Sequence, residues 1–158
     1  MTPLELYDDL IAEVENILRD VVTKNTAGEN VVGVKGYKYR LPLITADDED
    51  ESQFFPYFIV RLSEGKTEDD DSPWLVTADI LLGACENDKD VPGHEHIMVM
   101  IQRITDRFAA EPLLNNKFRA EQSMEWAVQD EDTYPFYFGG VEIKFRVPKI
   151  GRRIPDYD

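Results

Sequence analysis

The sequence predicts a single α/β (α+β) domain, a mostly antiparallel sheet with two main helices packed on it in the order α-β-β-β-α-β-β. Two observations point to this fold class. Apolar residues recur every three or four positions in two long segments, as in amphipathic helices, and alternate with polar residues in several shorter ones, as in strands. With 158 residues, 42% of them hydrophobic, the chain is long enough to bury one core, so we expect one domain over residues 1–158.

The first helix is expected over residues 3–24. Thr2 suits the N-cap, Pro3 fits the first turn, and Glu5 completes a capping-box pattern. Apolar residues at spacings of three and four form one stripe along this segment: Leu4, Tyr7, Leu10, Ile11, Val14, Ile17, Leu18, Val21 and Val22. We therefore expect this helix to pack on the sheet or on another subunit, and to end before Gly28.

Three strands are expected next, over residues 31–40, 54–62 and 74–82. Gly33 and Gly36 inside the first of them indicate a bulge or the close approach of another backbone. The third strand has apolar residues on both faces, which is typical of a strand in the centre of a sheet.

The second helix is expected over residues 92–110, and two alternating strands follow it. The apolar stripe of this helix consists of Ile97, Ile101, Ile104 and Phe108. The strands over 118–128 and 141–147 should each have one side facing solvent. We expect Trp126 on the inward side of the first strand, and a turn at Gly139 and Gly140 that leads into the second.

The charge and composition of the chain argue against a nucleic-acid-binding, secreted or membrane protein. The net charge is −15 and the pI is about 4.4, whereas nucleic-acid affinity comes mainly from Lys and Arg that neutralise phosphates. We therefore expect no specific nucleic-acid binding. We also expect neither a signal peptide nor a membrane span, because no segment has the basic and apolar regions of the one or the apolar length of the other. The single cysteine cannot form an internal disulfide, which is typical of a protein made in a reducing cytosol.

No catalytic, cofactor-binding or metal-binding set of residues is expected. His94 and His96 lie where the second helix should begin, and positions i and i+2 of a helix point about 200° apart, too far to share a metal ion. Cys85 could act as a nucleophile only beside a histidine, and it follows a buried apolar segment, which favours a small core residue. We therefore expect a protein that is not an enzyme.

One alternative is a metal-dependent nuclease. Glu142 and Lys144 should lie on one face of a strand, with Asp130 shortly before them, and this D…E-x-K set is similar to that of restriction-enzyme-type nucleases. In such enzymes carboxylates hold Mg²⁺ and the lysine steadies the attacking water. The missing basic footprint for DNA weighs against this alternative.

Opposite charges gather in separate segments of the chain. The acidic loops 47–53 and 64–72 lie within residues 44–72, where ten acidic residues face only Arg61 and Lys66, a local charge of 2 − 10 = −8. The C-terminal tail 148–158 is basic at its start. One interpretation is a pair of solvated loops and a frayed terminus. The other is that the tail of one copy lies over the acidic surface of the next, which favours a ring.

The second interpretation names the residues expected at contacts between copies. They are the cations of the tail and last strand, the polar face of the strand before it, and carboxylates of the two acidic loops. The set is Arg152, Arg153, Lys149, Arg146, Arg119, Glu121, Asp48, Asp50 and Asp70.

The order of elements resembles that of tail terminator (tail completion) proteins of tailed phages and related contractile-tail particles. Three segments carry the resemblance. They are the opening helix LELYDDLIAEVENILRDVV, the strand, turn and helix WLVTADILLGACENDKDVPGHEHIMVMIQRITDRF, and the closing segment YPFYFGGVEIKFRVPKIGRR. The family has no fixed catalytic motif, so no functional residue is carried over from it.

The resemblance implies a structural virion protein that forms a hexameric ring on the end of the tail tube. Such a ring ends tail growth and offers a docking surface to the head connector. The implied partners are further copies of the chain, the tube, a sheath protein and the connector, with no membrane and with DNA passing through the lumen. The implied location is the tail of a virion or tail-like particle, assembled in the bacterial cytoplasm.

Three other functions remain open from the sequence. One is another head–tail connector or a neck or baseplate adaptor of the same kind of particle. The second is the nuclease that would use Asp130, Glu142 and Lys144. The third is an acidic inhibitor that binds a basic partner protein, with an affinity that falls steeply with salt.

Overall fold

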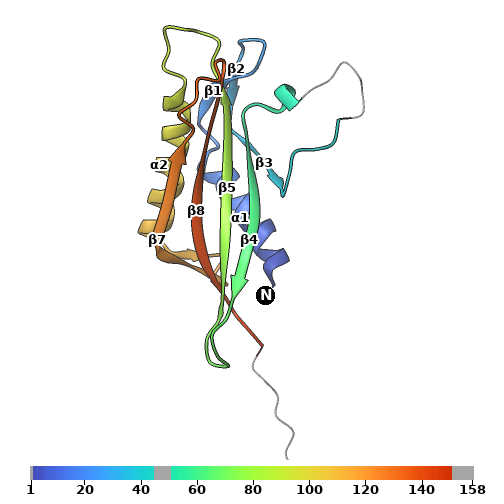
Figure 1. The fold of residues 1–158 in the computed structure, drawn as a ribbon, viewed down its shortest axis with the longest axis vertical. Helices are drawn as coiled ribbons and strands as arrows, with labels where there is room; N and C mark the ends of the chain where they lie inside the picture. Colours follow the sequence, from blue (N-terminus) through green and yellow to red (C-terminus); the bar gives the residue numbers. More distant parts are fainter. Residues whose placement is uncertain (1, 45–50, 151–158) are drawn as a thin grey trace, which may run out of the picture.

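The computed structural model describes residues 2–44 and 51–150 and confirms the expected α+β class. In these ranges, two α-helices lie on one face of an eight-stranded sheet, which is antiparallel except for one strand pair. The long strands run along the long axis of the molecule, and both helices lie on the same side of them (Figure 1). The described residues form a single compact unit, with more strands than the five that the sequence predicts.

Helix α1 spans Pro3–Ile17 and is shorter than expected. The Oγ1 of Thr2 accepts a hydrogen bond from the backbone N–H of Glu5 at 3.2 Å, as the capping pattern predicts. The prediction is wrong beyond Leu18, because the β-branched residues that follow pair in a sheet instead. The guanidinium of Arg19 donates to the carbonyl oxygen of Asn16 at 2.8 Å and so satisfies one acceptor at the helix end.

Three short strands follow α1: the first lies in the end of the expected helix, and the other two take the place of the one strand expected over 31–40. They are β1 (Val22–Lys24), β2 (Asn30–Val32) and β3 (Lys35–Lys38). The first two form an antiparallel hairpin, while β3 pairs in parallel with the next long strand. The break falls at Gly33, whose φ of +87° is accessible to glycine at little cost. The chain therefore changes direction there and cannot continue as one strand.

The two long strands β4 (Tyr57–Lys66) and β5 (Trp74–Cys85) pair in antiparallel fashion. A short 3₁₀ helix, η1 (Glu51–Phe54), lies at the end of the expected acidic loop 47–53 and overlaps the strand expected over 54–62 only at Phe54. Strand β4 begins three residues later than expected and extends into the second expected acidic loop, 64–72. Strand β5 has β4 on one side and the last strand of the chain on the other, so its central position is confirmed.

Helix α2 (His94–Ala110) begins two residues later than expected and is followed by β6 (Leu113–Leu114) and β7 (Phe118–Val128). The bounds of β7 match the prediction, but a bulge shifts its register between Ala120 and Met124. Within the described residues, β6 covers β7 only at Phe118 and Arg119, so the rest of β7 is an edge of the sheet.

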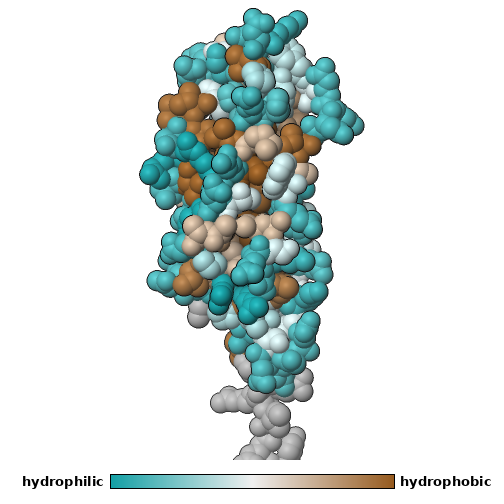
Figure 2. Space-filling view, turned by 90° about the vertical axis from the view of Figure 1, so that its left-hand side faces the viewer, coloured by the Kyte–Doolittle hydropathy of each residue, from teal (hydrophilic) through white to brown (hydrophobic). Residues whose placement is uncertain are grey.

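Strand β8 spans Phe136–Val147 and is five residues longer at its start than expected. The predicted turn at Gly139 and Gly140 is wrong: both glycines lie inside the strand and pair with Leu82 and Leu81 of β5. Trp126 pairs with Val141 on the helix-covered side, yet the Trp126 side chain is 54% exposed because it lies on the edge strand. Figure 2 shows the molecule from the side of α2 and β7, where apolar patches lie between polar ones.

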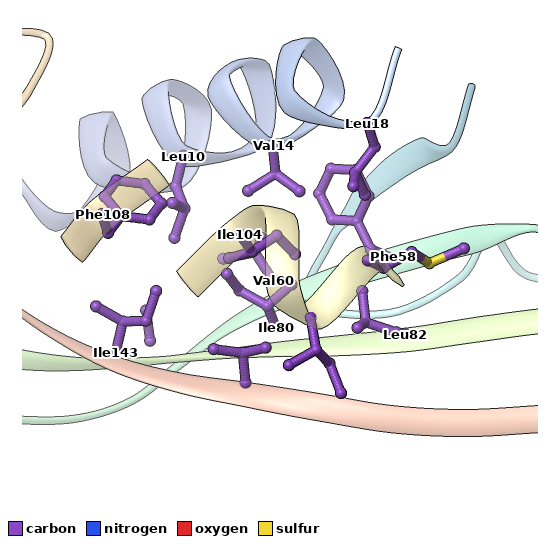
Figure 3. Packing of buried hydrophobic residues seen from close by; sticks show 14 of the residues in the cluster. Leu10, Val14, Leu18, Phe58, Val60, Ile80, Leu82, Ile104, Phe108 and Ile143 are labelled. Atoms are coloured by element: carbon purple, nitrogen blue, oxygen red, sulfur yellow. The ribbon is translucent and has the colours of Figure 1, made fainter. Parts of the chain in front are cut away.

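The main core fills the space between the two helices and the sheet. Leu10 and Val14 of α1 point toward the sheet, and residues of β4, β5 and β8 point toward the helices (Figure 3). The fully buried members with the largest side chains include Phe58, Phe108, Phe118, Phe145, Leu6, Leu10, Leu18, Ile80 and Leu82. Burial of each such side chain contributes about 1.5–3 kcal/mol relative to an exposed one.

A second, smaller cluster covers one end of the opposite face of the sheet. The segment between β3 and β4 supplies Leu41 and Phe55, which pack on Tyr57, Ile59 and Cys85. The ring of Phe55 stacks on that of Phe136, with 4.8 Å between the ring centroids. This end of the face is therefore buried, and only the rest of it lies open.

Close packing at Gly36 gives a test of the core. A Cβ at this position would lie 2.2 Å from the ring of Phe58, which is fully buried and has no room to move. We expect Gly36→Ala to lower the free energy of unfolding by about 1–3 kcal/mol in urea denaturation. The matched control is Gly65→Ala, whose Cβ would meet its nearest neighbour at 3.7 Å and should cost less than about 0.5 kcal/mol. Equal costs would contradict this account of the packing.

Candidate functional site

The face of the sheet turned away from the helices carries polar and charged side chains that do not take part in the main core. Side chains that pair directly across antiparallel strands lie on the same face. The register of β4, β5, β8 and β7 therefore arranges this face in lateral rows, each with one residue from each strand. We call it the uncovered face.

An acidic row crosses the middle of the uncovered face. Asp79 of β5 pairs with Glu142 of β8, which in turn pairs with Glu125 of β7. On the far side, Asp79 pairs with Arg61 of β4. We define the acidic row as Asp79, Glu125 and Glu142. Burial raises the pKa of Glu142, and the negative charges of Asp79 and Glu125 raise it further.

A basic end lies further along the same face. Arg146 of β8 pairs with Arg119 of β7, and Lys66 of β4 lies in the same lateral row. Lys144 lies between this row and the acidic row. The basic end is defined as Lys66, Arg119, Lys144 and Arg146. Lys144 is two residues of β8, about 7 Å, from Glu142 of the acidic row, and Arg146 is four residues, about 13 Å, from it.

A shallow hollow of about 540 Å³ opens over the acidic row and over the part of the face away from the basic end, with Asp79, Glu125 and Glu142 in its lining. Beyond the acidic row, its lining includes Gly140 and the small neighbour of Gly140 in β7, Ala127. Leu81 and Phe138 give it apolar walls, and the exposed Trp126 lies at its border. Along β8 the surface therefore changes from apolar at Gly140 to acidic and then to basic.

Three of the residues expected at contacts lie together at the basic end. The guanidinium Nε of Arg146 donates to Oε1 of Glu121 at 3.0 Å, and both residues line a hollow of about 690 Å³ beside the bulge of β7. Arg119 lines the same hollow and forms no ion pair with any residue in 2–44 or 51–150. The structure thus brings Arg119, Glu121 and Arg146 together, as the alternation of the two strands indicates.

The start of the basic tail contacts an acidic turn of its own chain. The Nζ of Lys149 donates to Oγ1 of Thr67 at 2.8 Å and also to the backbone oxygen of Asp69, in the turn between β4 and β5. The pKa of Asp69 is lowered, first by the hydrogen bond from Ser72 and to a lesser degree by the charge of Lys149. Asp70 lies in the same turn. Lys149 and this turn are therefore already partners within one molecule.

Four of the expected contact residues lie outside the described residues. They are Asp48 and Asp50 of the first acidic loop and Arg152 and Arg153 of the tail.

The structure separates the residues of the nuclease alternative. Glu142 and Lys144 share the uncovered face, but Asp130 lies beyond the end of β7, five residues from Glu125, the partner of Glu142. At about 3.3 Å per residue this distance is about 16 Å. Asp79 takes the neighbouring position instead. Within residues 2–44 and 51–150, no group of three or more His, Cys, Asp or Glu residues has an arrangement that could hold a metal ion.

The histidines and the cysteine have structural contacts. Nε2 of His96 lies 3.0 Å from Oε1 of Glu86, a carboxylate that is only 2% exposed. Burial opposes ionisation of Glu86, but hydrogen bonds from His96 and from the backbone of Asp88 outweigh it and lower its pKa. The buried thiol of Cys85 lies 3.1 Å from Oδ1 of Asn87, and burial raises its pKa, so the reactive thiolate is disfavoured.

Two features of this face were not found from the sequence. The sequence places Asp79 in a strand expected at the centre of the sheet and Glu125 in a strand expected to have one side facing solvent, and it indicates no role for either. Alternation gives the side of each residue within one strand, but the pairing of three distant strands decides which carboxylates become neighbours. The hollow was missed because Gly139 and Gly140 were taken for a turn. A strand pattern that continues through both glycines, from Phe136, is the signal that could have revealed it.

Comparison with known proteins adds no family to this description. No protein-family model matches the chain, and no curated protein matches it significantly. In the part of the chain that the structure describes, neither helix combines the length and apolar character needed to cross a bilayer.

The acidic row predicts a pH-dependent gain in stability on neutralising Glu142. Its raised pKa means that ionisation of this carboxyl lowers the stability of the fold as the pH rises through that pKa. We expect Glu142→Gln to raise the free energy of unfolding at pH 7 by roughly 0.2–1 kcal/mol, the size of a cross-strand like-charge term. The gain should disappear below the ordinary pKa of 4.5, where the carboxyl is protonated in both states.

Urea denaturation between pH 4 and pH 8 measures this difference. The matched control is Glu29→Gln, which removes one exposed carboxylate away from the sheet face. A Glu142→Gln variant that is less stable than the wild type at pH 7 would show that repulsion in the row is not the dominant effect.

Proposed function

We propose that the protein is a structural component of a phage tail or tail-like particle, a tail terminator that assembles into a ring on the end of the tail tube. In this role it ends tube growth and offers a docking surface to the head connector. The observation that carries the proposal is the uncovered face, where acidic and basic groups are sorted into separate rows and a hollow with apolar walls on one side opens over the acidic row. Such a surface is suited to another protein rather than to a small substrate.

The charge distribution supports a head-to-tail arrangement of copies. Contacts between unlike patches of identical subunits produce rings when the rotation closes. The acidic row and basic end are unlike patches, and the edge of β7 offers further backbone groups for contact. A net charge of −15 also suits a lumen through which DNA passes, because like charges keep DNA from binding to its wall.

Electron microscopy of particles from the source strain tests this function. With the gene deleted, we expect overlong or unfinished tails that also lack heads, and complementation with the wild-type gene should restore normal particles. Tails of normal length with heads attached would overturn the proposal. A defect confined to head attachment or to the baseplate would instead support the connector or adaptor alternative.

The nuclease alternative keeps one favourable observation, which is the placement of Asp79, Glu142 and Lys144 on neighbouring strands of one face. Such an enzyme would use Asp79 in place of Asp130. We expect no cleavage of double-stranded DNA after long incubation with Mg²⁺, since the net charge of −15 repels the phosphate backbone. Cleavage by the wild type that disappears in the Lys144→Ala variant would favour the nuclease.

The acidic-inhibitor alternative differs in its assembly state. It requires a stable monomer and a basic partner whose affinity falls steeply with ionic strength. A terminator instead requires contacts between copies, in solution or on the tube.

A further inference from the structure

The tail has a sequence that is complementary to the uncovered face. Along β8, Gly140, Glu142, Lys144 and Arg146 point to this face at every second position. Ten positions later, the corresponding residues are Ile150, Arg152, Ile154 and Asp156. An apolar residue thus corresponds to the hollow, a cation to the acidic row, and an anion to the basic end. An extended segment parallel to β8 would match all three, because its side chains repeat with the same period.

Ile150 is the tail residue in this match whose position the structure describes. Its side chain is 95% exposed, the highest value among the large hydrophobic side chains of the described residues. A wholly exposed isoleucine next to charged residues gains stability when it enters an apolar hollow. The side of the hollow at Gly140 is the part of the uncovered face where Leu81 and Phe138 provide apolar walls.

Geometry places the receiving hollow on a second copy. In its own chain, Gly140 lies seven residues from Val147, about 23 Å along β8. Ile150 is only three residues beyond Val147, which allows a span of about 10 Å. Lys149 is also tied to the turn between β4 and β5. Ile150 therefore cannot reach the hollow of its own molecule.

We propose that the C-terminal segment 150–158 of one copy lies along the uncovered face of a second copy, parallel to β8, with Ile150 over Gly140, Arg152 at the acidic row and Asp156 at the basic end. This inference deepens the proposed function, on which it rests for its biological role, and replaces the acidic loops with the uncovered face as the receiving surface. The contact is heterologous, so each copy donates one tail and receives one. In a closed ring each contact forms between copies that the other contacts already keep close together, so a weak individual contact is sufficient.

Photo-crosslinking between full-length copies tests the proposal. One copy, the donor, carries benzoylphenylalanine in place of Ile150, and the second copy, the acceptor, is labelled with ¹⁵N. Mass spectrometry of the irradiated mixture should find cross-links from position 150 to residues around Leu81, Ala127 and Gly140 of the labelled copy. Cross-links only within the donor, cross-links elsewhere on the acceptor, or none at all would overturn the proposal.

Charge exchange tests the register. Donor Arg152→Glu and acceptor Glu142→Lys should each reduce the cross-link yield about tenfold, and their combination should restore it. Acceptor Glu125→Lys, on the exposed edge strand, serves if Glu142→Lys does not fold. The donor control is Arg153→Glu, which makes the same charge change at a position that faces away in this register. Equal losses for the two arginine variants, or no restoration in the combined mixture, would contradict the register.

An acceptor control measures the effect of net charge alone. Asp106→Lys changes the charge by the same amount on the exposed face of α2 and should leave the yield unchanged. Failure of the docking proposal is distinguishable from failure of the proposed function. Absence of the cross-link would overturn only the docking proposal, whereas normal tails after gene deletion would overturn only the proposed function.

Discussion

The antiparallel pairing of β5 with β8 is the constraint on which the rest of the structure depends. All twelve residues of Trp74–Cys85 pair with the twelve of Phe136–Val147. This register places Ala78 and Ile80 beneath the helices together with Ile143. A slip of one residue would move every one of these side chains to the opposite face. The same ladder that aligns the core therefore also fixes the order of charges on the uncovered face.

The pairing of β5 with β8 serves both the core and the uncovered face. The core requires apolar residues on alternate positions, and the remaining positions are left to the uncovered face. There the chain places Glu142 between Asp79 and Glu125, where burial and then the two like charges raise its pKa and so oppose its ionisation. A partner that brings a cation to this row would relieve the repulsion, so the arrangement favours association over the stability of a single copy. A strained or repulsive surface of this kind is typical of binding sites.

Local sequence patterns predicted correctly the elements in which the alternation of apolar and polar residues is unambiguous. The bounds of β7 and the central place of β5 follow from clean periodicity. The segment after Leu18 was predicted wrongly because its apolar spacing also fits a helix, whereas hairpin pairing with β2 decides its structure. Gly139 and Gly140 were predicted wrongly because a glycine pair is usually a turn signal, and their partners in β5 lie too far away in the chain to be inferred.

The sequence by itself determined the α+β class, the two amphipathic helices, the alternation of the long strands and the separation of charge between a basic tail and an acidic body. These features depend on residues a few positions apart. The tertiary structure decided which strands are neighbours, and with them the acidic row, the hollow at Gly140 and the contact of Lys149 with the turn between β4 and β5. These features join residues tens of positions apart, and only the packing of the strands and helices around one core fixes their register.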